Sequence, residues 1–161
     1  MRRYLRVPFA LVWAVALVTL SAQAAGMVEV RIDVELDCPS CAQGLERRLG
    51  RIDQVAVVAV SAEDGQIVVT PDPGTAVDLT EIRDAVRNAG FIPDAIRLTA
   101  VGELDGGPEM PVLALPDATL ELDAGDTTLP EPGRMVRLVG VVEFAGRGDP
   151  PVLRVQSVDA T

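Results

Sequence analysis

Two cysteines are the residues of this sequence with the clearest chemical potential. Cys38 and Cys41 are the only cysteines in the chain, and Pro39 and Ser40 separate them. Two thiols at this spacing can chelate one soft metal ion, or they can close on each other as a small disulfide. Zinc normally takes four ligands, and the chain has no histidine and no third cysteine. A two-coordinate ion such as Cu(I) or Hg(II) therefore suits the pair better than zinc.

The composition excludes several classes of function. Without histidine, imidazole acid–base chemistry and histidine metal ligands are absent. Every basic residue is arginine, so a lysine Schiff base and a P-loop are excluded as well. The net charge of −10 repels phosphate backbones, and we expect no nucleic-acid binding. No nucleophile–base pair is recognisable, so the sequence predicts a protein that is not an enzyme.

The N-terminal residues 1–24 have the pattern of a secretory signal peptide. Basic residues (Arg2, Arg3 and Arg6) precede an apolar run over 7–20, and Ala22-Gln23-Ala24 follows as a cleavage signal. The apolar run is shorter than the ~20 residues that a membrane-spanning helix needs. The sequence thus predicts a periplasmic or secreted bacterial protein with no stable membrane span after signal removal.

The cysteine pair lies where a strand pattern changes to a helix pattern. Residues 28–36 alternate strictly between apolar and polar side chains, which predicts a strand with one wet face. After the pair, an apolar stripe at helical spacing predicts a helix over 42–49. A cysteine at the start of a helix meets unpaired N–H groups and the helix dipole. Both favour the thiolate of Cys41.

The elements that follow complete a recognisable order. A β-branched run over 54–61, a turn with Asp64-Gly65 and a return run over 66–70 predict a hairpin. Asp78 with Glu81 forms a capping-box pattern that opens a second helix, and 93–98 reads as a last strand. The order β-α-β-β-α-β over 25–98 predicts an α+β, ferredoxin-like domain. Both of its helices would cover one face of a four-stranded antiparallel sheet.

Residues 99–161 differ in composition and pattern: they are rich in proline and glycine and show no apolar stripe at helical spacing. Short strand candidates separated by turn signals predict a small all-β domain, either a sandwich or an OB-like barrel. Gly140, inside one candidate strand, would allow the sharp bend of a barrel corner. We expect this domain to dock a partner or to cover the polar or metal-bearing face of the first domain, and we interpret Met110 and Met135 as packing residues. The strand candidates are 100–104, 110–115, 119–122, 135–144 and 152–158.

The segment 28–98 resembles the heavy-metal-associated (HMA) domain family, which includes copper chaperones, the periplasmic mercury-binding protein and N-terminal modules of copper P-type ATPases. The family's Met-x-Cys-x-x-Cys loop stands here as Leu36-Asp37-Cys38-Pro39-Ser40-Cys41. Asn88-Ala89-Gly90-Phe91 matches the family's Ala-Gly-Tyr or Ala-Gly-Phe, whose ring packs near the metal loop. Leucine for methionine at 36 is a near-isosteric change, and Pro39 stiffens the loop.

The resemblance implies an exported chaperone or scavenger of Cu(I), or of Hg(II), that works by thiolate exchange through Cys38 and Cys41. Its partner would be a metal-transporting membrane protein or another exported metal-binding protein. Two alternatives stay open on the residues alone. In one, the protein is structural or interaction-based and its cysteine pair is closed as a disulfide. In the other, the pair works as a dithiol redox couple.

Overall fold

The computed structural model describes residues 24–36, 38–146 and 149–160. The predicted signal segment lies outside these ranges, apart from Ala24. Among the described residues, no helix is both long and apolar enough to cross a membrane. The elements, in chain order, are β1 (Gly26–Val34), α1 (Pro39–Leu49), β2 (Val55–Ser61), β3 (Gln66–Pro71), α2 (Leu79–Asn88), β4 (Pro93–Gly107), β5 (Met110–Ala114), β6 (Thr119–Asp123), β7 (Met135–Glu143) and β8 (Val152–Ala160).

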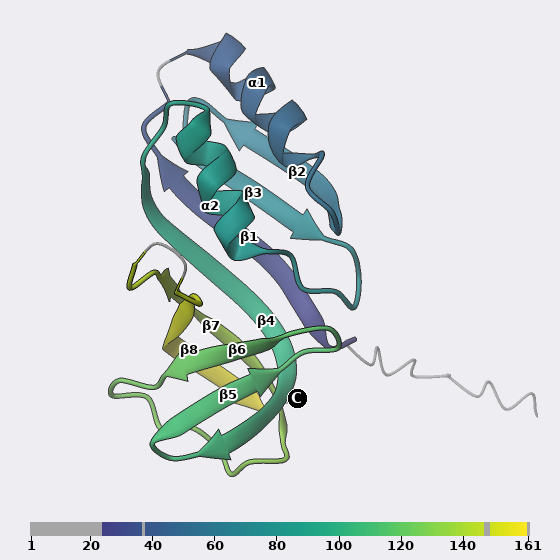
Figure 1. The fold of residues 1–161 in the computed structure, drawn as a ribbon, viewed down its shortest axis with the longest axis vertical. Helices are drawn as coiled ribbons and strands as arrows, with labels where there is room; N and C mark the ends of the chain where they lie inside the picture. The colour runs from purple at the N-terminus through teal and green to yellow at the C-terminus, as the bar shows by residue number, and fades with distance from the viewer. Residues whose placement is uncertain (1–23, 37, 147–148, 161) are drawn as a thin grey trace, which may run out of the picture.

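The first half of the described chain has the predicted ferredoxin-like arrangement. The strands lie in the order β2-β3-β1-β4, and each neighbouring pair is antiparallel. Figure 1 shows α1 and α2 side by side on one face of this sheet. The predicted element order and the placement of both helices on one face are confirmed.

The alternation in β1 explains which face the helices cover. Val30 and Ile32 are fully buried under the helices. The polar residues that alternate with them lie on the opposite face. There Arg31 pairs with Glu29 at 2.8 Å, and Arg97 of the neighbouring strand pairs with Asp33 at 2.6 Å. A strand with period-two patterning can satisfy both environments at once, because its side chains alternate between the two faces.

β4 is a single strand of 15 residues that belongs to both halves of the molecule. The prediction of two separate strands, over 93–98 and 100–104, is wrong on this point, and the boundary predicted between 98 and 99 lies inside β4. Ala100, Val101 and Gly102 are buried in succession. Consecutive burial breaks the alternation because the strand at this point has protein on both of its faces.

The second half is a closed ring of strands. β4 pairs with β5, then β6, β8 and β7 follow, and β7 pairs back onto β4. The ring corresponds to the barrel alternative of the prediction. Within it, β6 and β8 pair in parallel, and the other neighbouring strands pair antiparallel. At Gly140 the β7–β8 register shifts, and a Cβ there would collide with the carbonyl oxygen of Arg154. The bend predicted at Gly140 is thus required by a close approach of two backbones.

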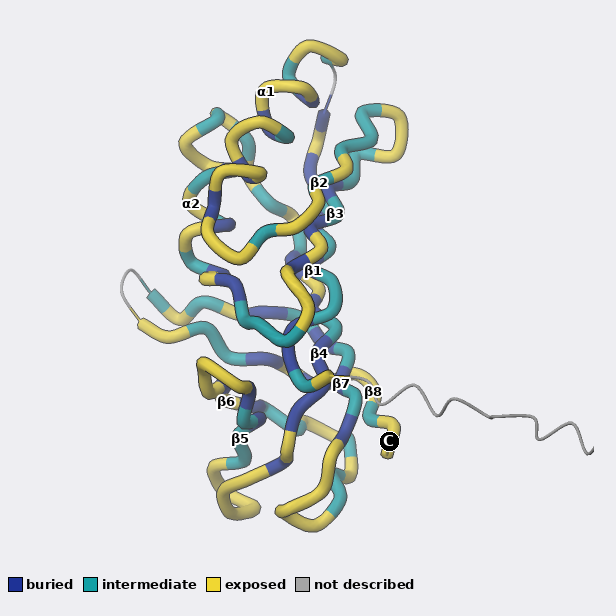
Figure 2. Tube along the Cα trace, turned by 90° about the vertical axis from the view of Figure 1, so that its right-hand side faces the viewer, coloured by how far each residue is buried: buried dark blue, intermediate teal, exposed yellow. Residues whose placement is uncertain are grey.

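The two halves share one hydrophobic core and lie end to end. A single cluster of buried side chains runs from Met27 in β1 to Val155 in β8. Figures 1 and 2 show both helices in one half of the long axis, with the N-terminus of α1 at its end, and the barrel in the other half. The idea that the barrel covers the cysteine loop is therefore wrong.

Candidate metal centre

Cys38 caps the N-terminus of α1. Its backbone is extended, with φ −137° and ψ 126°, and the helix begins at the next residue, Pro39. The prediction placed the helix start three residues too late, at 42. Proline suits the first helical position because its φ is already helical and its missing N–H would have no partner there. Pro39 is the sequence signal that could have placed the start of this helix correctly, because proline is common at the first helical position.

The structure brings the two cysteines together and shows them as a disulfide, with their Cα atoms 5.4 Å apart. The Sγ of Cys38 also accepts a hydrogen bond of 3.1 Å from the backbone N–H of Cys41. Ser40 places its hydroxyl 3.6 Å from the same sulfur. Both cysteines are half-buried, so part of each side chain remains exposed to solvent.

The local electrostatics favour negative charge on Cys38. The first turn of α1 contains no acidic residue. The orphan N–H groups and the helix dipole therefore act on the sulfur without a competing carboxylate in that turn. We expected this effect at Cys41, but Cys38 occupies the capping position. In the disulfide form, the N–H of Cys41 points at the Cys38 sulfur.

Three residues singled out from the sequence lie near the start of the cysteine loop. Leu36 is only 7% exposed and belongs to the core cluster, as expected for an anchor in place of the family's methionine. Phe91 packs against the same core, and its N–H donates to the carbonyl of Val86 at 3.3 Å. Gly90 takes a φ of 94°, which favours glycine and turns the chain back from α2. Leu36, Gly90 and Phe91 all line one cleft at this end of the molecule.

The family comparison agrees with this geometry. Residues 31–91 match the model of the heavy-metal-associated domain, a segment that includes both cysteines, both helices and Phe91. This segment, less than half of the chain, is similar to the HMA domain family. A comparison with curated proteins finds no match to the chain. The HMA segment indicates a heavy-metal-binding kind of function, and it ends before β4 enters the barrel.

The donor set of the HMA loop consists of the two sulfurs. Among the described residues, no group of three or more His, Cys, Asp or Glu side chains is arranged to hold a metal ion. Asp37, inside the loop, lies outside the described residues. Carboxylates do line the neighbouring cleft, but hard oxygen donors match soft ions poorly. They give this end of the HMA domain a negative rim made of Asp33, Glu35, Glu63, Asp64 and Asp94.

The two methionines considered from the sequence do not reach the HMA loop. Met110 begins β5 and is 78% exposed, and Met135 begins β7 in the same barrel. The barrel lies at the opposite end of the long axis from the cysteines (Figure 1). Neither thioether can join the cysteine sulfurs on one ion within a single chain.

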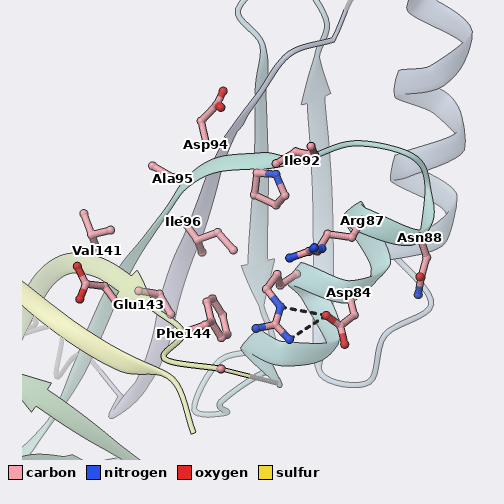
Figure 3. A pocket seen from close by; sticks show the side chains of 14 residues that line it. Asp84, Arg87, Asn88, Ile92, Asp94, Ala95, Ile96, Val141, Glu143 and Phe144 are labelled. Carbon is pink, nitrogen blue, oxygen red and sulfur yellow. Dashed lines mark hydrogen bonds and ion pairs between the residues drawn. The ribbon is translucent and has the colours of Figure 1, made fainter. Parts of the chain in front are cut away.

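Sequence reasoning did not predict a second cleft, which lies at the junction of the two halves. It has a volume of 780 Å³ and lies between α2, the start of β4 and the end of β7. Figure 3 shows the Asp84 carboxylate bonded to the neighbouring arginine, with Phe144 below and Arg87 above. Arg83, that neighbour, also stacks on the Phe144 ring at 4.2 Å. The lining combines arginines, carboxylates and apolar side chains, which is not the donor set of a soft-metal site.

Proposed function

We propose that the reduced protein binds one soft metal ion between the Sγ atoms of Cys38 and Cys41, with Cu(I) favoured over Hg(II). The observation that carries the proposal is the HMA match over 31–91 together with the position of both cysteines at the strand-to-helix turn. Two sulfurs on one turn suit an ion that accepts near-linear coordination.

Reduction comes first in this mechanism. Two electrons and two protons from an external dithiol open the disulfide and leave two thiols. Each thiol then loses its proton as the ion binds, since the thiolate is the ligand. The Cys38 thiolate keeps the hydrogen bond from the Cys41 N–H and lies at the positive end of α1.

Transfer of the ion would proceed by ligand exchange. The half-buried pair leaves one side of the ion open, so a thiolate of the partner can attack it there. A three-coordinate intermediate forms, and one cysteine of the HMA domain then leaves. No enzymatic reaction is needed.

The proposed setting is the periplasm or another exported space. The proposed partner is a metal-transporting membrane protein or a second exported metal-binding protein. The carboxylates beside the loop support a partner whose docking surface is basic, because opposite potentials speed encounter.

Cu(I) titration under anaerobic, reducing conditions tests the proposal. Competition with a chromophoric Cu(I) chelator should give one ion per chain. Cys38→Ser and Cys41→Ser should each abolish this uptake. Ser40→Ala, a matched change inside the loop that removes no thiol, should retain it. Failure of the reduced protein to take up Cu(I) at low micromolar concentration would contradict the proposal, and a parallel Hg(II) titration ranks the two ions.

A second candidate function follows from the disulfide itself. With the pair closed, the HMA domain would serve as a structural or interaction module, and the cysteines would only brace the turn. Thiol counting on protein trapped directly from the periplasm separates the two candidates. A fully oxidised population that no cellular dithiol reduces would favour the structural module. Insulin reduction by the protein would instead favour a dithiol redox couple.

A further inference from the structure

The cleft at the junction of the two halves has arginines on one side and apolar side chains on the other. Arg83 and Arg87, four residues apart in α2, both line it. The opposite side is formed by Ile96 of β4, which is only 4% exposed, and by Phe144, which follows β7. Figure 3 shows Arg87 extending from α2 into the space between the helix and the strands. The interior of this cleft therefore offers a cation beside an apolar surface.

The carboxylates of the lining do not neutralise this cation. Asp94 and Glu143 point away from the middle of the cleft in Figure 3. Glu143 is also engaged by Arg154, whose Nη1 atom lies 3.0 Å from its Oε1 atom. Arg154 does not line the cleft. The third carboxylate, that of Asp84, is bonded to Arg83 at 2.9 Å.

The two arginines differ in what they already contact. The Arg83 guanidinium pairs with Asp84 and lies 4.2 Å from the centre of the Phe144 ring. The Arg87 side chain is exposed and makes no ion pair or hydrogen bond with another described residue. Like charges four residues apart on a helix repel each other. An anion in the cleft would pair with Arg87 and offset this repulsion.

The end of a helix provides another reason for an arginine at this position. Arg87 lies in the last turn of α2, where a positive charge complements the helix dipole. Arg48 lies in the last turn of α1, is exposed as well and does not line the cleft. The two residues share a helix-end environment and differ in their access to the cleft. Arg48 is therefore a matched control for Arg87.

We propose that the junction cleft binds a small organic carboxylate with an apolar body. Arg87 holds the carboxylate, and the body lies against Ile96 and Phe144. The volume of 780 Å³ falls in the range of small-molecule sites, about 300–1,000 Å³. A guanidinium presents parallel N–H donors that match the two oxygens of a carboxylate, so the site selects this group over a neutral amide.

Titration of the oxidised, metal-free protein with hydrocinnamate, followed by backbone amide NMR shifts, tests the proposal. We expect saturable shifts at Arg87, Ile96 and Phe144, with a dissociation constant of about 1 mM or below. Hydrocinnamamide has the same body without the charge and should bind about tenfold more weakly. Acetate has the charge without the body and should also bind about tenfold more weakly or worse. The outcome is independent of Cu(I) uptake, since neither cysteine lines this cleft.

Two variants assign the carboxylate contact. Arg87→Gln should weaken hydrocinnamate binding about tenfold and leave hydrocinnamamide binding unchanged. Arg48→Gln removes the same charge at the end of α1 and should change neither. The proposal is overturned if the cleft amides show no saturable shift, or if the carboxylate and the amide bind equally well. Equal losses in Arg87→Gln and Arg48→Gln would also overturn it and leave Arg87 with a helix-end role alone.

Discussion

The two halves of the molecule share a strand but use it in different ways. The HMA half buries one face of its sheet under helices and leaves its end loops free, and one of these holds Cys38 and Cys41. The barrel half closes its strands on each other and has neither cysteine nor histidine. The chemistry therefore lies at the end of the long axis away from the barrel. The barrel can influence it only through β4, the common core and the junction contacts.

The largest effect is expected where one residue serves both halves. Leu98 is fully buried in β4, opposite Val30 of β1 on one side and Gly140 of β7 on the other. Leu98→Ala should lower the free energy of unfolding by about 3–4 kcal/mol, from lost burial and the cavity left behind. Chemical denaturation followed by far-UV circular dichroism measures this change.

Two control variants each truncate a buried leucine that belongs to only one half of the molecule. Leu45→Ala empties a site under α1, and Leu153→Ala empties one in β8, both at fully or nearly fully buried positions. With one continuous core, all three variants should shift a single unfolding transition. A barrel transition that stays in place when Leu45 is truncated would show instead that the halves unfold separately.

A somewhat smaller effect is expected from crowding the barrel at Gly102 in β4. A Cβ at this position would lie 2.9 Å from the Cγ atom of Leu113 and close to the Ala114 carbonyl oxygen. Gly102→Val should cost about 2–3 kcal/mol through overpacking. Gly107→Val adds the same side chain in open space and should cost less. Equal losses in the two variants would contradict the close approach of β4 and β5.

The junction contact between Arg83 and Phe144 should contribute less. The Arg83 side chain is 14% exposed and its guanidinium lies over the Phe144 ring, so the pair joins α2 to the end of β7. A double-mutant cycle with Arg83→Gln and Phe144→Leu should give a coupling energy of about 0.5–1 kcal/mol. Zero coupling would show that the stacking does not hold the halves together.

The HMA half should tolerate a conservative change at Leu36. Leu36→Met restores the residue that the resembled family has before its cysteines, at a buried position of similar volume. The free energy of unfolding should change by less than about 1.5 kcal/mol. Cu(I) stoichiometry, measured as above, should stay at one per chain. Loss of uptake in Leu36→Met would contradict an anchoring role for this side chain.

Much of the HMA half was predictable because local patterns and tertiary environment agree there. The alternation in β1 matches a sheet with one wet face, and Asp78 caps α2 through the N–H groups of Thr80 and Glu81. The start of α1 was misplaced because the apolar stripe begins at Cys41. Cys38 caps the helix because its backbone is extended, and the spacing of apolar residues gives no information on backbone angles.

The barrel was less predictable because its pairings are non-local. Five strand segments were placed by their turns, but the parallel contact of β6 with β8 joins residues far apart in sequence. The closure of β7 onto β4 likewise has no local signature. Gly140 was a residue whose type pointed to a barrel corner.

The sequence by itself determined the donor chemistry: two sulfurs, no imidazole and no third thiol. It also determined the strand-to-helix setting of those sulfurs, because side-chain period is a local property. Only the tertiary structure decided that Cys38 is the capping residue, that β4 crosses both halves and that the barrel lies away from the cysteines. Those features depend on which distant segments pair and pack, and the free energy that selects among such pairings comes from shared burial.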